Sequence, residues 1–333
     1  MSKRARAARF LDVTGVGALL RRAGTWHGAL VLNYHRIGEP SRSLLDWDLW
    51  SATREDFDAQ VGFLARNFEL LGAEELGPDV LRARGRHAVV TFDDGYRDNH
   101  SVAYPVLREH GVRATFFLTT GFLDGDATAW WDEIAWLVRT SERDHVDPDG
   151  WLEQVVRFDE PGRQQAVALL RRRCASLPGA RVDEFLDWLA GATGGQRRPA
   201  DGHSDWMTWD MARELKRGGM TIGAHTVSHP VLASVPAEDQ RREIERSLDR
   251  LEQELGERPR LFSYPVGWRS SFTPATKSLL RESGVRLAFS NYGGFPAPGN
   301  WDPYDVRRTN LSPDTSLSVF RATTTLPRLF ARW

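Results

Sequence analysis

Short apolar segments rich in β-branched residues alternate with amphipathic segments along most of this chain. Seven segments have the composition of buried strands: Ala29–His35, Ala88–Asp94, Ala114–Thr120, Thr221–His225, Arg260–Tyr264, Arg286–Ser290 and Asp305–Thr309. Helical patterns lie between them, such as Ala237–Gly256 with one apolar stripe and Thr273–Gly284 with a Thr-Pro start and a glycine end. Strands that alternate with helices predict an α/β fold with a parallel sheet or barrel.

Most of these strand candidates end in a side chain that can take part in chemistry. The ends are Tyr34-His35, Asp93-Asp94, His225, Tyr264-Pro265 and Ser290-Asn291. In βα barrels the C-terminal strand ends, with the loops that follow them, form the active face. We therefore expect these side chains to gather at one end of the sheet.

The composition excludes several classes of function. The 333 residues carry 44 Lys and Arg against 45 Asp and Glu, so no nucleic-acid partner attracted by bulk charge is expected. Cys174 is the only cysteine, which rules out an intramolecular disulfide. No stretch approaches the ~20 continuous apolar residues that a membrane span needs.

The N-terminal segment, residues 1–28, is a basic arm that glycines interrupt. Lys3, Arg6 and Arg9 precede apolar residues that Gly15 and Gly17 break up. Because this pattern does not match a secretory signal, we expect a cytoplasmic protein. We favour a short helix packed against the body. The alternative is an interfacial anchor, with peripheral contact at the inner membrane face.

Residues 122–206 separate two strand candidates and greatly exceed the usual connection of roughly 2–6 residues. We interpret them as a helical insertion within a single domain that spans residues 1–333. Five tryptophans there fall in helical patterns and are expected in a core rather than on a carbohydrate platform. They are Trp130, Trp131, Trp136, Trp151 and Trp188. The run Arg171–Arg173 is expected on a solvated helix face.

Two short motifs contain the parts of a hydrolytic metal site. Thr91–Gly95 reads Thr-Phe-Asp-Asp-Gly, and its adjacent aspartates should point in different directions from a strand end. His225–Pro230 places two histidines four residues apart, a spacing that brings both to one side of a single turn. Such a site needs three ligands, an open position and a nearby base. In the zinc proteases called zincins, a glutamate follows the first histidine. That glutamate is absent here, which disfavours a protease of this type.

On these two motifs, the chain resembles the polysaccharide deacetylase family, the NodB-like carbohydrate esterases of family 4. The resemblance extends over residues of about 29–325 and covers the insertion and the N-terminal arm poorly. It implies a deformed (β/α) barrel of about seven parallel strands with a helical insertion. It also implies that Asp94, His225 and His229 bind a divalent metal and that Asp93 is the general base.

A third motif of the family is matched by Phe262–Gly267, which reads Phe-Ser-Tyr-Pro-Val-Gly. The resemblance implies that the backbone N–H of Val266 helps to hold an oxyanion. We further assign four residues to substrate binding: Tyr264, Pro265, Asn291 and Arg308.

The chain departs from the family pattern in two places. The usual arginine two residues before the motif proline is Ser263 here, and Arg308 or Arg269 is expected to replace it by pairing with Asp93. The usual late Leu-x-His is also absent, and Leu317–Val319 stands near its expected place.

An early Tyr-His takes over the role of the late histidine in a branch that resembles poly-N-acetylglucosamine deacetylases. Leu32–Ile37 fits that branch, so His35 is the general-acid candidate; the alternative is a hydrogen-bonded core histidine. A protonated His35 favours cleavage of an amide over an ester, because an amine leaves poorly without a proton.

The resulting expectation is a metal-dependent N-deacetylase that acts on N-acetylated amino sugars in a glycan, a glycolipid or a lipid- or nucleotide-linked precursor. Two alternatives stay open: a glycan-binding barrel with weakened catalysis, and a deformylase or amidohydrolase that cleaves a related amide. Two imidazoles and a carboxylate suit Zn²⁺ best, with Co²⁺, Ni²⁺, Mn²⁺ and Fe²⁺ as the other candidates.

Overall fold

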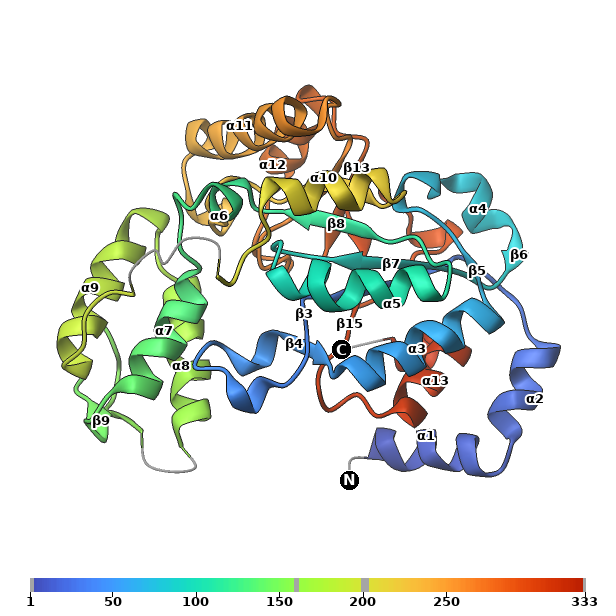
Figure 1. Cartoon of the computed structure of the whole chain (residues 1–333), viewed down its shortest axis with the longest axis horizontal. Helices are drawn as coiled ribbons and strands as arrows, with labels where there is room; N and C mark the ends of the chain where they lie inside the picture. Colours follow the sequence, from blue (N-terminus) through green and yellow to red (C-terminus); the bar gives the residue numbers. More distant parts are fainter. Residues whose placement is uncertain (1–2, 159–161, 199–203, 332–333) are drawn as a thin grey trace.

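A curved parallel sheet forms the centre of the molecule (Figure 1). The computed structural model describes residues 3–158, 162–198 and 204–331. The strands of this sheet are β2 (Ala29–Tyr34), β5 (Glu69–Leu70), β7 (His87–Phe92), β8 (Thr115–Leu118), β11 (Thr221–Ala224), β12 (Leu261–Ser263), β13 (Leu287–Ser290), β14 (Val306–Arg307) and β15 (Thr309–Asn310). Six of the seven predicted strands are present within a few residues of their expected bounds.

The sheet curls into a nearly closed barrel. Its eight-strand path runs β14-β13-β12-β11-β8-β7-β2-β15, and every neighbouring pair on it is parallel. The two outermost strands are consecutive in the chain, and Arg308 alone separates them. The predicted strand Asp305–Thr309 is therefore split in two, because the chain crosses from one edge of the sheet to the other at Arg308. Strand β5, which was not predicted, pairs with the first residues of β7.

Side chains of each strand alternate between two apolar clusters. In β2, Leu30 and Leu32 pack into the larger cluster, under the helices, whereas Ala29 and Val31 join a smaller one with Phe117. Because every residue of β2 and β7 is buried, apolar residues follow one another in both strands instead of alternating with exposed polar ones. This architecture confirms the expected deformed α/β barrel.

Helices cover the outside of the barrel (Figure 1). They are α3 (Arg54–Asn67), α4 (Pro78–Arg82), α5 (Tyr104–Glu109), α10 (Trp209–Arg217), α11 (Ala237–Leu255), α12 (Pro274–Glu282) and α13 (Leu317–Thr325). The predicted start and end residues are found at the ends of two of these helices. Thr273 caps α12 by accepting a hydrogen bond from the Thr276 N–H, and α11 ends at Gly256 with φ of 74°.

The predicted insertion is helical and lies to the left of the barrel in Figure 1. It contains α6 (Thr120–Asp124), α7 (Trp130–Thr140), α8 (Arg163–Ala175), α9 (Val182–Thr193) and an unpredicted antiparallel pair, β9 (His145–Val146) with β10 (Val156–Arg157). Helices α7 to α9 enclose an apolar cluster of their own, against which Trp136, Trp151 and Trp188 pack. The boundaries 122–206 and the single-domain organisation of 1–333 stay predictions.

The basic arm forms two helices, α1 (Lys3–Val13) and α2 (Val16–Ala23). Both contact α13, which follows the last strand. Among the described residues no helix is both long enough and apolar enough to cross a bilayer.

Truncation of Phe116 should cost about 3–5 kcal/mol of the free energy of unfolding. Its ring is fully buried and stacks on Phe92 with the centroids 4.8 Å apart. Urea denaturation of Phe116→Ala would measure the loss. Phe10→Ala, which removes the same group from a side chain 63% exposed, is the matched control and should change stability far less. Equal effects would contradict the assigned core.

Candidate active site

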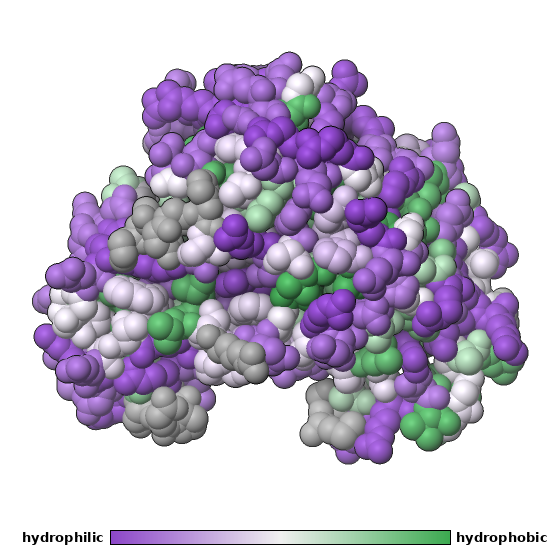
Figure 2. Space-filling view, viewed as in Figure 1, coloured by the Kyte–Doolittle hydropathy of each residue, from purple (hydrophilic) through white to green (hydrophobic). Residues whose placement is uncertain are grey.

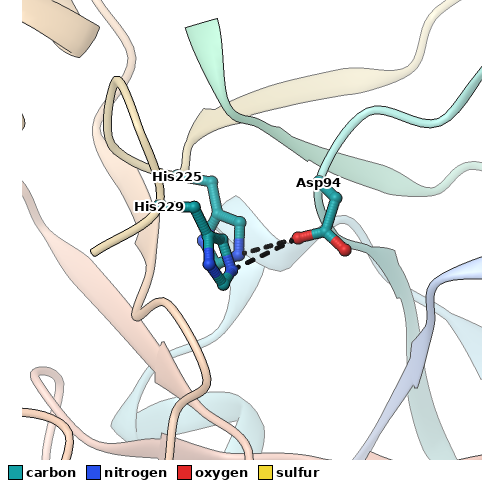
Figure 3. Close-up of side chains that lie close together, drawn as sticks. All are labelled: Asp94, His225 and His229. Carbon is teal, nitrogen blue, oxygen red and sulfur yellow. Dashed lines mark ion pairs between the residues drawn. The ribbon is translucent and has the colours of Figure 1, made fainter. Parts of the chain in front are cut away.

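The C-terminal ends of β7 and β11 bring the two predicted motifs together. Asp93 and Asp94 follow β7, and His225 and His229 lie in the loop after β11. The Nε2 atoms of His225 and His229 stand 3.3 and 3.4 Å from Oδ1 of Asp94 (Figure 3). All four side chains are at least 94% buried and border one pocket. The expected convergence of residues distant in sequence is therefore present.

The geometry of Asp94, His225 and His229 fits a tetrahedral cation site. Their ligand atoms all lie within 4.8 Å of one another. Two ligands held at ~2.0–2.1 Å from a tetrahedral ion stand about 3.3–3.4 Å apart, which matches both Nε2–Oδ1 distances. Oδ1 of Asp94 is buried and has no hydrogen-bond partner in the described part of the chain. A shared cation would satisfy this oxygen.

Both imidazoles are prepared to offer Nε2 as a lone-pair donor. Nδ1 of His225 lies 2.7 Å from the carbonyl oxygen of Ser263, so it donates its proton there and leaves Nε2 free. Burial and the neighbouring His225 ring lower the pKa of His229 to about 3, which keeps that imidazole neutral. Burial alone would lower the pKa of His225, but the Asp93 and Asp94 carboxylates raise it, which shows how strongly this point attracts positive charge.

Residues of both motifs adopt an unusual backbone conformation. Asp94 after β7, and Thr226 and His229 in the loop after β11, all have positive φ, at 75°, 68° and 59°. This region is costly for residues other than glycine, so the surroundings must stabilise it. Glu243 of α11 does so by accepting hydrogen bonds from the N–H groups of Val227 and Ser228, at 2.8 and 2.9 Å, and from the Ser228 hydroxyl at 2.7 Å.

Asp93 lies outside the cluster of three candidate ligands and is held by Arg308. The guanidinium donates to both carboxylate oxygens, at 2.8 and 2.7 Å, and Asn33 donates to Oδ2 at 3.1 Å. Burial alone would raise the pKa of Asp93, but the charge of Arg308 and then that of His225 hold it well below its usual range. Asp93 is therefore held as an ionised carboxylate, which is the form that a general base requires.

Arg308 takes the place of the missing motif arginine. One of its nitrogens donates to the Ser263 hydroxyl at 2.8 Å, so the small serine leaves room for an arginine from another part of the barrel. Arg269, the other candidate, lies instead over the ring of Tyr292. Arg308 was also assigned to substrate binding, but its side chain is fully buried behind Asp93 and does not border the pocket.

His35 lies beside Asp93 at the edge of the pocket. Its Nε2 is 3.9 Å from Oδ2 of Asp93, and its side chain is 18% exposed. The backbone around it is fixed, since the His35 N–H donates to the Ser51 hydroxyl and the His35 carbonyl accepts from Asn99. A side chain that borders the pocket argues against a core histidine.

Val266 has a backbone conformation that few β-branched residues adopt. Its φ is 62°, and no acceptor for its N–H occurs among the described residues. Gly267 is also left-handed, with φ of 67°. Its N–H donates to the Pro265 carbonyl at 2.6 Å, and a Cβ on it would stand 2.6 Å from that of Asn291. Because Val266 also lines the pocket, its N–H is available to a ligand there.

The pocket between barrel and insertion has a volume of about 280 Å³. His35, Asp93, Asp94, His225, His229, Val266, Trp268, Asn291 and Asn310 line it from the barrel, with Asp48 and Leu49 from the loop before β4 (Trp50–Ala52). Asn291, which was assigned to substrate binding, borders this pocket. Tyr264 and Pro265, assigned the same role, do not: both are buried away from the pocket, and the Tyr264 hydroxyl donates to the Tyr304 carbonyl.

The insertion supplies the opposite wall, which the sequence did not indicate. Trp130, Trp131, Arg171, Arg172 and Ala175 line it. The solvated face expected for Arg171–Arg173 is wrong for two of its members. Arg171 pairs with Asp46 and Asp48, and Arg173 donates to the Trp151 carbonyl.

Trp131 contacts a metal-ligand candidate directly. Its ring packs edge-on against His229 with the centroids 4.4 Å apart. Its indole N–H donates to the Tyr96 hydroxyl, which in turn donates to Asp132. Burial raises the pKa of Asp132 to about 7. The helical pattern around Trp131 indicated burial but not this partner.

The fold and the site together define a class of hydrolase, and comparison with known proteins gives the family. The model of the polysaccharide deacetylase family matches residues 81–143 and 185–289, which together make up just over half of the chain. The chain belongs to this family. Membership supports a deacetylase function and agrees with the resemblance, although the matched residues are fewer than the expected 29–325.

Individual relatives are distant. YxkH from Bacillus subtilis is 20% identical over 296 residues, 88% of this chain and 74% of the relative. Among solved structures, the Streptococcus pyogenes deacetylase PplD in complex with acetate has a TM-score of 0.59 at 19% identity, covering 90% of this chain and 98% of its own. IcaB from Ammonifex degensii has a TM-score of 0.55 at 20% identity, covering 90% and 97%. At these identities the likeness shows the fold.

Arg308→Lys should lower kcat/KM for acetate release by about 10²-fold. Lysine keeps the charge but loses the two-pronged grip that orients Asp93. The matched control is Arg269→Lys, at the other arginine that the sequence allowed, and it should stay near the wild-type rate. Similar losses in both variants would contradict the assignment of Arg308.

Proposed function

We propose that this protein is a metal-dependent N-deacetylase that removes acetyl groups from N-acetylated amino sugars in a glycan, a glycolipid or a glycan precursor. One observation carries the proposal: an ionised carboxylate, Asp93, lies beside a three-ligand cluster but outside it, at the wall of an open pocket. Family membership supplies the deacetylase class. The metal dependence and the sugar substrate belong to the proposal.

Asp94, His225 and His229 would hold the ion, for which we propose Zn²⁺ ahead of Co²⁺, Ni²⁺, Mn²⁺ and Fe²⁺. When bound, a divalent ion polarises the acyl carbonyl and lowers the pKa of a water from 15.7 to about 7. Asp93 accepts the proton of the attacking water. Its orientation is set before the reaction by Arg308 and Asn33.

The two remaining steps are the stabilisation of the oxyanion and the departure of the amine. The free N–H of Val266 donates to the developing oxyanion, an interaction whose removal typically costs about 3 kcal/mol. His35, protonated at Nε2, donates to the leaving nitrogen. Without that proton the sugar amine would have to leave as an anion.

The paired arginine weakens the alternative of a glycan-binding barrel with little catalysis. That alternative drew support from the missing motif arginine, and Arg308 now fills its place beside Asp93. A deformylase or an amidohydrolase would use the same residues, so acyl-group preference distinguishes these readings. Comparing formate with acetate release from matched substrates would decide it.

We further propose a cytoplasmic location and a lipid- or nucleotide-linked sugar as substrate. Family membership supports an acetylated sugar as the substrate. Recovery of a tagged protein from the periplasm or the medium would contradict the location.

The functional test separates the base from the ligands. Asp93→Asn should abolish acetate release yet retain the metal, because its amide cannot accept the proton while Asp94, His225 and His229 remain. His225→Ala should lose both. Metal content by mass spectrometry and acetate release from N-acetylglucosamine oligomers are the measurements. Full activity of Asp93→Asn would exclude it as the base.

His35→Ala should slow amide cleavage by about 10²–10⁴-fold but slow the cleavage of an aryl acetate much less. A phenolate leaves without a proton, whereas a sugar amine does not. Parallel assays on an N-acetylated sugar and an aryl acetate measure the ratio. Equal losses on both substrates would remove the acid role.

A further inference from the structure

The two N-terminal helices expose their large apolar side chains. Phe10 and Val13 of α1 are 63% and 78% exposed, and Val16, Leu19 and Leu20 of α2 are 38%, 66% and 37% exposed. Together these five residues form what we call the α1–α2 surface. Figure 2 shows green hydrophobic residues among purple ones at the lower right, where Figure 1 places these helices.

The inner face of the same helices makes several polar contacts. Arg21 of α2 donates to the Thr325 hydroxyl at 2.9 Å, and its guanidinium lies over the ring of Phe63. Asp12 of α1 accepts from the Ser318 hydroxyl at 3.0 Å and pairs with Arg321. A surface helix of a soluble body normally turns its apolar stripe inward. Here α2 places a charged residue inside and its leucines outside.

Cations surround the α1–α2 surface. Lys3, Arg6, Arg9 and Arg22 are exposed, as is Arg328 of α14 (Pro327–Phe330). None of these five forms an ion pair within residues 3–158, 162–198 and 204–331. Asp12 is the only acidic residue on α1, α2, α13 and α14, and Arg321 already pairs with it. In α1, the spacing of Arg6, Arg9, Phe10 and Val13 places charge and apolar groups on one side of the helix.

We propose that the α1–α2 surface binds interfacially to an anionic lipid bilayer. Exposed leucine and phenylalanine enter the boundary between headgroups and acyl chains, and the surrounding Lys and Arg meet anionic headgroups. A second copy of the chain fits this surface poorly. A two-fold contact would set the same unpaired cations against each other.

Membrane binding would leave the pocket open. No residue of α1, α2, α13 or α14 lines it, and Figure 1 places these helices away from α7 to α9. The proposal therefore does not depend on the proposed function, and it is tested by binding alone.

The test is co-sedimentation of the full chain with extruded vesicles. One set contains phosphatidylcholine alone, and the other includes about a third phosphatidylglycerol. The protein should pellet with the anionic vesicles and much less with the neutral ones. Binding should weaken as salt rises, because added ions screen the attraction between arginine and headgroup. Failure to bind anionic vesicles at low salt would overturn the proposal.

Paired variants separate apolar from charged contributions. Phe10→Ser/Leu19→Ser and Arg6→Gln/Arg9→Gln should each reduce partitioning by about tenfold or more. The matched controls are Leu44→Ser/Leu169→Ser, at residues 51% and 48% exposed, and Arg217→Gln/Arg246→Gln on other helices. Thermal melts by circular dichroism confirm that all variants fold.

The competing occupant is a second copy of the chain. Light scattering after size exclusion gives the oligomeric state of wild type and of Phe10→Ser/Leu19→Ser. A wild-type dimer that this variant splits would identify a self-association surface and overturn the proposal. Partitioning that falls equally in the control variants would do the same.

Discussion

A buried ion pair between Arg308 and Asp93 is the constraint on which the rest of the site depends. Two charges removed from water are costly unless hydrogen bonds satisfy them both. Arg308 meets this condition by donating to Asp93, to the Ser263 hydroxyl and to the Ser290 carbonyl. Because Arg308 also joins the two edge strands of the barrel, one residue links closure of the sheet to the orientation of Asp93. The remaining side of Asp93 faces the pocket.

Backbone strain is concentrated around that pocket. Five described residues other than glycine have positive φ, and four of them are Asp94, Thr226, His229 and Val266. Each such conformation costs about 1–3 kcal/mol and persists only where the surroundings impose it. Glu243 fixes the histidine loop from α11, and Trp131 fixes the His229 ring from the insertion. The site therefore depends on elements of both the barrel and the insertion.

The sequence predicted the parts of this site that depend on local pattern. Strand ends, the paired aspartates and the spaced histidines can each be recognised from a few neighbouring residues. The choice between Arg308 and Arg269 could not be made in this way, because it depends on where the sheet closes. The strand pattern alone could have corrected the assignment of Tyr264. Side chains alternate along β12 and the residue after it, so Tyr264 shares the outer side with Phe262, whereas Ser263 points inward. This alternation would have excluded Tyr264 from the pocket.

The insertion is harder to predict, because helical periodicity shows which face is apolar but not what that face meets. Within it, Trp131 of α7 contacts the metal-ligand candidate His229, and Asp132 of the same helix accepts a hydrogen bond from Tyr96. This helix lies in the part that the family model matches, up to residue 143. Arg171 and Arg172 of α8 lie in the unmatched stretch, yet they line the same pocket. The residue on this wall that contacts His229 thus lies in the part of the chain that the family model matches. The two arginines that a bound substrate would meet lie in the part that the model does not match.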